Sequence, residues 1–240
     1  IPESEVFTKL VSFPKMSMDD LASAVAYEAE QYIPLPMQDV NYSYSLGADR
    51  PDGGMDVLIV AAPIKLIEKY EQVIQMAGLN PVAIDTDMIA LSRCVVAPNE
   101  KGSILVVNIG ARTTDLAVVR QGRVNFTRSI GVGSAALTRA LMNGLQIDES
   151  QAEQFKRAYG LQENQLEGKV AIALKQVAQT IAVEVSRTAS FYSSKANEPI
   201  VSVKLAGGGA SLPGLVTYLS EFVQGEIVLA NSGLRIDQDG

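Results

Sequence analysis

The sequence predicts an α/β protein in which a small α+β unit precedes a larger α/β unit, and three observations support this. Strand-like and helix-like segments in residues 1–83 follow the order β-α-β-β-α-β, the split arrangement of a small α+β sandwich. Three strand-like segments then follow one another from residue 103, joined by tight turns. A later strand runs into three consecutive glycines and then into a helix, a layout typical of α/β folds.

The composition narrows the classes of function. The chain has 240 residues, of which 47% are apolar and 20% charged, as in globular proteins with a packed core. The net charge of -7 argues against sequence-independent nucleic-acid binding but leaves room for small anionic ligands. The chain has no His and a single Cys, Cys94, which removes the usual triads, an internal disulfide and most zinc chemistry. No apolar run approaches the ~20 residues that span a bilayer and no signal peptide is visible, so a cytoplasmic protein is expected.

The small unit begins with an alternating strand at residues 6–12. Ser17, followed three residues later by Asp20, predicts a capping box that opens a helix over residues 18–33, which ends at two prolines. The remaining predicted elements are a strand at 40–46, a turn at 48–54, a strand at 55–62, a helix at 63–77 and a short strand at 81–85.

The larger unit follows a helical segment at residues 85–96 and a loop at 98–102, which is the expected domain boundary. One long helix has apolar residues at helical spacing and should bury that face. The predicted elements are strands at 103–109, 115–120 and 123–130, helices at 135–143, 149–158 and 169–194, a strand at 200–206 and a helix at 212–222.

The stretch NIGARTTD, residues 108–115, has the composition of a turn that wraps a phosphate. Gly110 permits close approach of a ligand, Thr113 and Thr114 add hydroxyl donors, and successive turn amides can converge on an anion. Asp115 can hold a metal-bound water or cap the turn. An ordinary β-hairpin carries the same residue types, and the stretch taken alone favours that alternative.

The stretch LAGGGASLPGL, residues 205–215, carries a strand into three glycines and then into a helix. Ser211 is a candidate N-cap and Pro213 lies in the expected first turn. A nucleotide that lies against a strand end and a helix N-terminus needs bare backbone of this kind. A tight turn is the alternative, but three glycines cost more backbone entropy than a turn usually requires.

A third candidate feature is the run of Glu153, Lys156 and Arg157 on the helix predicted at residues 149–158. The spacing places Glu153 and Lys156 on one face, and a solvated ion pair is the simpler interpretation. Neither glycine stretch fits the G-x-G-x-x-G or G-x-x-x-x-G-K-[ST] pattern, so the common dinucleotide and P-loop folds are not supported.

Taken in this order, the hairpin, the Glu-x-x-Lys helix and the glycine turn resemble the actin, heat-shock chaperone and sugar kinase superfamily. The chain more closely resembles the PilM family of actin-like type IV pilus assembly proteins, a relative of the cell-division protein FtsA. The similar stretches are FPKMSMDDLASAVAYEAEQYIPLPMQDV (13–40), MAGLNPVAIDTDMIAL (76–91), FTRSIGVGSAALTRAL (126–141) and SQAEQFKRAYGL (150–161). Within them, EAEQYIPLP is rather specific for that family.

The resemblance implies an actin-like (ribonuclease H-like) fold with the split subdomain at its N-terminus. Residues 1–83 would be the extra subdomain that PilM and FtsA share, and 84–102 a linking helix of the first lobe. Residues 103–135 and 195–240 would form the second-lobe sheet with the nucleotide loops, and 136–194 its helical subdomain.

The resemblance also implies a nucleotide site for ATP with Mg²⁺ in the intact protein. The hairpin would be the second phosphate loop, the Glu and Lys of the helix would flank the ribose and base, and the glycine turn would back the adenosine. No catalytic residue and no resident metal site is assigned. The implied site residues are Asn108, Gly110, Ala111, Arg112, Thr113, Thr114, Asp115, Glu153, Lys156, Arg157, Gly207, Gly208 and Gly209.

The role implied by the family is a nucleotide-responsive scaffold with weak or no ATP hydrolysis. Its partner would be the N-terminal cytoplasmic segment of a PilN-type protein, bound in a groove at the edge of the extra subdomain, formed by the helix and strands that lie in the range from Leu21 to Val60. Other pilus platform and motor proteins are further expected partners, with no nucleic acid and only indirect membrane contact. The expected location is cytoplasmic, peripheral to the bacterial inner membrane.

Two departures from the family pattern stand out. The first phosphate loop, upstream of the extra subdomain, and the final helix and strand after about Ile236 are missing, so we expect a chain trimmed at both ends that does not bind ATP by itself. Asn108 occupies a position where the family usually has Asp. An amide offers one carbonyl oxygen and no charge, so it holds a Mg²⁺-bound water less well.

Two other functions remain open from the sequence. A working ATPase or small-molecule kinase would use Asp115, with Asp85 or Asp87, but nothing marks the substrate cleft that a kinase needs. An FtsA-like filament former would bind membrane through a C-terminal amphipathic helix, and the last residues, GLRIDQDG, show none.

Overall fold

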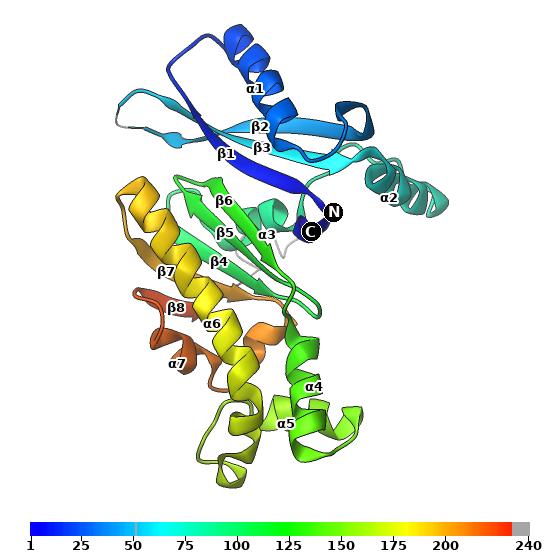
Figure 1. The fold of residues 1–240 in the computed structure, drawn as a ribbon, viewed down its shortest axis with the longest axis vertical. Coiled ribbons are helices and arrows are strands. Elements are labelled where there is room, and N and C mark those ends of the chain that lie inside the picture. The colour runs from blue at the N-terminus through cyan, green and yellow to red at the C-terminus, as the bar shows by residue number, and fades with distance from the viewer. Residues whose placement is uncertain (51, 232–240) are drawn as a thin grey trace, which may run out of the picture.

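The computed structural model describes residues 1–50 and 52–231, which form two sheets (Figure 1). A three-stranded sheet belongs to the N-terminal unit and a five-stranded sheet to the rest of the chain. Within these described ranges, none of the helices combines the length and apolar character that crossing a membrane requires.

The small sheet has the order β1-β3-β2. Its edge strands, β1 (Phe7–Phe13) and β2 (Val40–Asp49), are both antiparallel to the central β3 (Met55–Pro63). Helix α1 (Met18–Tyr32) covers one face and is capped as predicted, because the Ser17 side chain accepts from the amide of Asp20. The core between helix and sheet consists of Phe13, Leu21, Val25, Ala29, Ile33, Val40, Val57, Ile59 and Ala61.

The prediction of a strand at residues 81–85 is wrong. After β3 comes α2 (Ile64–Met76), and residues 79–86 lie in neither helix nor strand. Pro81 has no N–H to give to a ladder, and the Val82 side chain is 95% exposed, so it packs against no neighbouring strand. The small unit therefore has the order β-α-β-β-α, one strand short of the split arrangement.

The large sheet has the order β6-β5-β4-β7-β8. Strands β4 (Ser103–Ile109), β5 (Thr114–Arg120) and β6 (Arg123–Ile130) form consecutive antiparallel hairpins. Strand β7 (Ile200–Ala206) is parallel to β4, and β8 (Glu226–Leu229) is parallel to β7. Strands β4 and β5 are almost wholly buried, which explains their uninterrupted apolar runs.

Helices fill the crossover from β6 to β7. They are α4 (Ser134–Leu145), α5 (Glu149–Ala158) and α6 (Lys169–Ala196), and Figure 1 shows α6 crossing the sheet with α4 and α5 at one end of it. The predicted apolar face of α6 lies in the main core, with Val170, Leu174, Ile181, Val185 and Ala189 buried and Val177 partly buried. Helix α3 (Asp87–Val95) packs in a second core with β4 and β5.

The C-terminal part differs from the sequence prediction in two ways. The glycines lead into a 3-10 turn at Gly208–Ser211, so α7 (Leu215–Ser220) begins later than expected and Gly214, not Ser211, is its N-cap. Strand β8 was not predicted. The expected absence of a further helix and strand after about Ile236 falls outside the described residues, and the proposed domain boundaries stay predictions.

Candidate nucleotide site

The turn between β4 and β5 is fixed to the start of α4. The amide of Gly110 donates to the carbonyl of Thr113 (2.9 Å), which closes the turn. The amides of Ser134 and Ala135 donate to the carbonyls of Gly110 and Ala111, both at 2.9 Å. The first turn of α4 therefore finds its acceptors on the hairpin, so hairpin and helix are held together.

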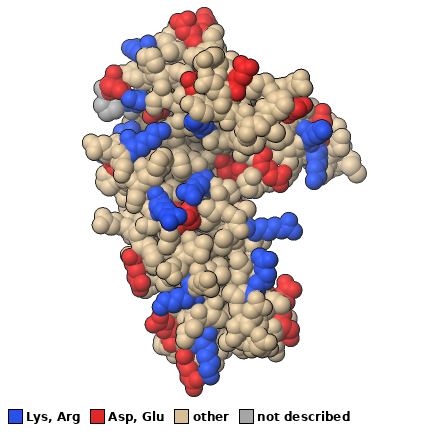
Figure 2. Space-filling view, in the orientation of Figure 1, with Lys and Arg blue, Asp and Glu red and all other residues tan. Residues whose placement is uncertain are grey.

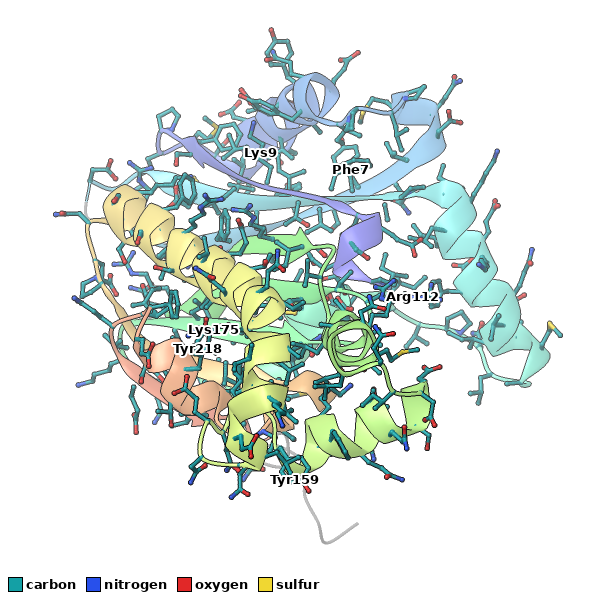
Figure 3. The ribbon with its side chains drawn as sticks, turned by 60° about the horizontal axis from the view of Figure 1, so that its bottom comes forward. Phe7, Lys9, Arg112, Tyr159, Lys175 and Tyr218 are labelled. Atoms are coloured by element: carbon teal, nitrogen blue, oxygen red, sulfur yellow. The ribbon has the colours of Figure 1, made fainter. Side chains whose placement is uncertain are left out.

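The outer side of this turn keeps free donors. Ala111, Arg112 and Thr113 have successive amides that donate to no other backbone or side-chain group among the described residues. Successive amides of this kind form a concave nest that binds anions. Figure 3 shows the Arg112 side chain beside α4, where it is exposed. The turn thus offers backbone donors and one cation to a phosphate.

Asp115 lies behind the turn, with only 3% of its surface exposed. One carboxylate oxygen accepts from the Thr113 hydroxyl (2.9 Å) and the other from the Ser129 hydroxyl. Burial raises the pKa of Asp115, the two hydroxyl donors oppose that rise, and the nearby Asp87 adds to it. Asp115 therefore supports the turn from inside and does not present a free carboxylate to a ligand.

The three glycines have different roles. A Cβ on Gly207 would lie 2.5 Å from both Oδ1 of Asn108 and the carbonyl oxygen of Ile109, and its φ is 82°. A Cβ on Gly209 would lie 2.3 Å from Cγ2 of Ile109. A Cβ on Gly208 would meet nothing within 4 Å. The outer two glycines let the turn pack against the end of β4, and the middle one leaves bare backbone open to a ligand.

Lys156 is a buried amine that links α5 to α4. Its Nζ donates to Glu153 Oε1 (2.5 Å), Thr138 Oγ1 (2.8 Å) and Ser134 Oγ (3.0 Å). Burial alone would raise the pKa of Glu153, but hydrogen bonds from Lys156 and Thr138 outweigh it and lower the pKa. The Arg157 side chain is 83% exposed, with Nε 3.7 Å from Glu153. Arg157 and Glu153 thus form a solvated ion pair. Lys156 instead forms what we call a buried clamp, because its amine joins α5 to α4.

A cavity of about 450 Å³ lies between the Glu-x-x-Lys helix and the glycine turn. Of the predicted site residues it is lined by Glu153, Lys156, Arg157, Gly208 and Gly209. The hairpin residues do not line this cavity; they lie next to it through the start of α4. Asn108 and Gly207 contact each other at the end of β4.

Sequence reasoning missed four residues that line the cavity, namely Ser134, Leu137, Ser211 and Leu212. Ser134 had a visible signal, because it follows Gly133 at the entry to a helix. A Cβ on Gly133 would lie 2.8 Å from the backbone of Ala111, so glycine is what allows the helix start to approach the hairpin.

The other carboxylates considered for catalysis lie away from this cavity. Asp85 pairs with Arg93 at 2.5 Å, and Asp87 accepts from the amide of Glu3 at 2.9 Å. Within the described part of the chain, no three His, Cys, Asp or Glu residues are grouped so as to hold a metal ion. The residues present fit the nucleoside and phosphate parts of a ligand, and a Mg²⁺ ion that accompanies the phosphates would be held mainly by those phosphates and by water.

The sequence matches the family described as type IV pilus assembly protein PilM over residues 1–238. Among solved structures, the chain superposes on one described as "PilM-PilN type IV pilus biogenesis complex" with a TM-score of 0.78 and 24% identity. That superposition covers 96% of this chain and 68% of the other.

Among curated proteins, FtsA and EutJ match parts of the chain in sequence. FtsA of Neisseria meningitidis serogroup B (strain MC58) is 27% identical over 176 residues, 70% of this chain and 41% of that protein. The ethanolamine utilization protein EutJ of Escherichia coli K12 is 29% identical over 110 residues, 46% of this chain and 35% of EutJ. The chain thus spans less than half the length of these curated relatives.

MreB5 of Spiroplasma citri bound to AMPPNP superposes with a TM-score of 0.53 at 16% identity, over 69% of this chain and 60% of MreB5. A likeness at such low identity reports on the fold alone. The actin-like fold class predicted from the sequence is confirmed.

Proposed function

The chain belongs to the PilM family of type IV pilus assembly proteins, and from that membership we propose that it is an ATP-binding scaffold for the N-terminal cytoplasmic segment of a PilN-type protein. In this proposal the intact protein holds ATP with Mg²⁺ and works on the cytoplasmic side of the bacterial inner membrane. Its further partners are other pilus platform and motor proteins, and it reaches the membrane only through them.

The observation that carries the nucleotide half of the proposal is the shared cavity of the two motifs. Lys156 fixes one wall through its hydrogen bonds to α4, and Gly208 offers bare backbone on the other. Leu137 and Leu212 supply apolar surface for a flat ring, and Glu153 supplies an acceptor for a hydroxyl. The nest at residues 111–113 lies next to this cavity and suits a phosphate.

Binding without efficient turnover is supported by the state of the carboxylates. Hydrolysis or transfer needs a group that orients or deprotonates the attacking oxygen. Both oxygens of Asp115 accept hydrogen bonds from hydroxyls, and Asp85 is paired with Arg93. These carboxylates support the structure, which favours a scaffold over the alternative of an ATPase or kinase.

The partner segment has a candidate binding site beside the small sheet. A cavity of about 500 Å³ lies between residues 81–86 and the face of β3 that carries Leu58 and Val60. Val82 lines this cavity and is 95% exposed, so it offers apolar surface that a bound segment would bury. The superposed structure is itself described as a complex of PilM with PilN, which supports a partner of this kind for the family.

The test is a calorimetric titration of N-terminal segments of PilN-type proteins into the protein, with and without ATP. Val82→Asp places a charge on the cavity wall and should weaken binding at least about tenfold. Val73→Asp is the matched control, because Val73 is also exposed (62%) but does not line the cavity. Wild-type protein that binds no such segment in either condition would overturn the function, whereas equal binding by the Val82 variant would overturn only the location.

A further inference from the structure

The turn between β4 and β5 keeps few side-chain donors for a ligand. The Thr113 hydroxyl donates to Asp115 at 2.9 Å, and the Thr114 hydroxyl donates at 2.7 Å to a backbone carbonyl just before α4. A hydroxyl has a single proton to donate, so neither threonine can also donate to a phosphate. The donors left on the outer side of the turn are the amides of residues 111–113 and the guanidinium of Arg112.

The three cations among the predicted site residues differ in how far they are neutralised. Lys156 is buried and donates to Glu153 Oε1 at 2.5 Å as well as to two hydroxyls. Arg157 lies 3.7 Å from the other oxygen of the same carboxylate. Arg112 forms no ion pair within the described part of the chain, and it is exposed in the middle of the three free amides. Its positive charge is therefore available to a ligand, in a fork geometry that matches a phosphate.

Within the turn itself, residues 108–115, no carboxylate opposes this charge on the outer side. Asp115 is the only acidic residue of the stretch. It is 3% exposed, and both its oxygens accept hydrogen bonds inside the fold. Asn108 at the end of β4 carries no charge. Figure 2 shows basic side chains projecting from the surface where Figure 1 places the start of α4. The outer side of the turn therefore complements a group with several negative charges.

The turn lies outside the cavity that we propose for the nucleoside. Ser134 joins the two, because it lines the cavity and its amide donates to the carbonyl of Gly110 at 2.9 Å. Residues 108–115 do not line the cavity. A nucleotide whose nucleoside fills the cavity therefore reaches the turn only with the far end of its phosphate tail.

We propose that Arg112 binds the terminal phosphate of a nucleoside triphosphate and makes the site selective for a triphosphate over a di- or monophosphate. A terminal phosphate carries a charge of about −2 at pH 7, and an arginine fork binds it through two parallel hydrogen bonds. The amides of residues 111–113 donate to the same phosphate. This role of Arg112 rests on the proposed function, since the nucleoside must lie in the cavity. It gives the scaffold a means of distinguishing ATP from ADP.

The test is a calorimetric titration of ATP, ADP and AMP into the full-length protein, at constant Mg²⁺ and ionic strength. Arg112→Gln keeps a polar side chain and removes the charge, so it should weaken ATP binding at least about tenfold, as expected for the loss of one charged hydrogen bond. ADP binding should weaken less, and AMP binding should stay unchanged. Arg139→Gln is the matched control, because Arg139 is also exposed, lies on α4 and does not line the cavity. It should bind all three nucleotides as the wild type does.

A second measurement uses the unaltered protein and so does not depend on a variant. The wild type should bind ATP more tightly than AMP, and the ratio of the two affinities should fall as NaCl rises, because salt screens an exposed charge. Equal affinities for ATP and AMP would overturn the role of Arg112. Equal losses of ATP and AMP binding in Arg112→Gln, no loss at all, or the same loss in Arg139→Gln would overturn it too, while leaving the nucleotide site in place. A wild-type protein that binds none of the three nucleotides would overturn the proposed nucleotide site, and the role of Arg112 with it.

Discussion

Replacing Lys156 by Met should destabilise the helical part of the nucleotide site. The methionine fills similar space but cannot donate, so Glu153, Thr138 and Ser134 lose the amine that joins α5 to α4. The two hydroxyls are left without this partner next to a cavity wall, and the carboxylate loses its neutralising charge.

The size of the effect follows from the exposure of the partners. A hydrogen bond that involves a charged group contributes about 1.5–3 kcal/mol. The Glu153 side chain is 35% exposed, so water replaces part of what it loses, and the variant no longer buries an ammonium group. We therefore expect a net loss of about 2 kcal/mol, which for a chain of this size lowers Tm by about 4–8 °C.

The assay is urea unfolding of wild type and variant across pH, followed by circular dichroism. The pKa of Glu153 is lowered from 4.5 in the fold, so the stability it contributes is present above that pH and is lost as pH falls through the folded value. The deficit of Lys156→Met should therefore shrink in acid. Arg157→Met is the control and should change stability by less than about 0.5 kcal/mol. Equal stability of Lys156→Met and wild type at neutral pH would refute the buried clamp.

Three further predictions test the rest of the site. Gly207→Ala should lower the free energy of unfolding, measured in urea, by about 2–4 kcal/mol, because its φ is positive and the new Cβ would meet Asn108 and Ile109. Gly208→Ala is the control and should be nearly neutral. Equal losses in the two variants would contradict the packing of the turn. Asp115→Asn should remove a pH dependence, since a raised carboxyl pKa gives stability that is present below about pH 3.8 and lost as pH rises through the folded value; parallel stability curves for variant and wild type would refute this. Asn108→Asp in the full-length protein should strengthen Mg²⁺-dependent ATP binding in calorimetry, and no change would make Asn108 a neutral variation.

The elements that could be predicted from the sequence are those with local signals. Strands β4, β6 and β7 have the predicted bounds, because each apolar run stops at a turn residue. Helix α5 also has its predicted bounds, and Asp148 caps it with a full capping box. The strands of the large sheet other than β8 could therefore be predicted one at a time from local signals.

The elements whose prediction failed depend on partners that are distant in the sequence. The segment 81–85 has strand-like residues but no neighbour to pair with, whereas the unpredicted β8 is short and exists because β7 lies beside it. Helix α7 begins later than predicted, because Gly214, with a φ of 79°, is its N-cap in place of Ser211. Positive φ at a glycine follows from its packing and is not visible in the residue order.

In the site, residue types were predictable and burial was not. The sequence marked Glu153 and Lys156 as a pair, but the choice between a solvated pair and a buried clamp depends on α4, which comes from another part of the chain. The role of Asp115 likewise depends on Ser129 on the neighbouring strand. Such partners are set by the sheet, so the chemistry of the site became clear only in the fold.

The most direct measurement is a calorimetric titration of a PilN-type N-terminal segment into the full-length protein loaded with ATP and Mg²⁺. One experiment reports both halves of the claim, because peptide binding gives a saturating heat and ATP hydrolysis gives a steady one. The account predicts saturable binding with no steady heat from turnover. Failure of the segment to bind, or a steady hydrolysis heat that disappears in Asp115→Asn, would contradict it.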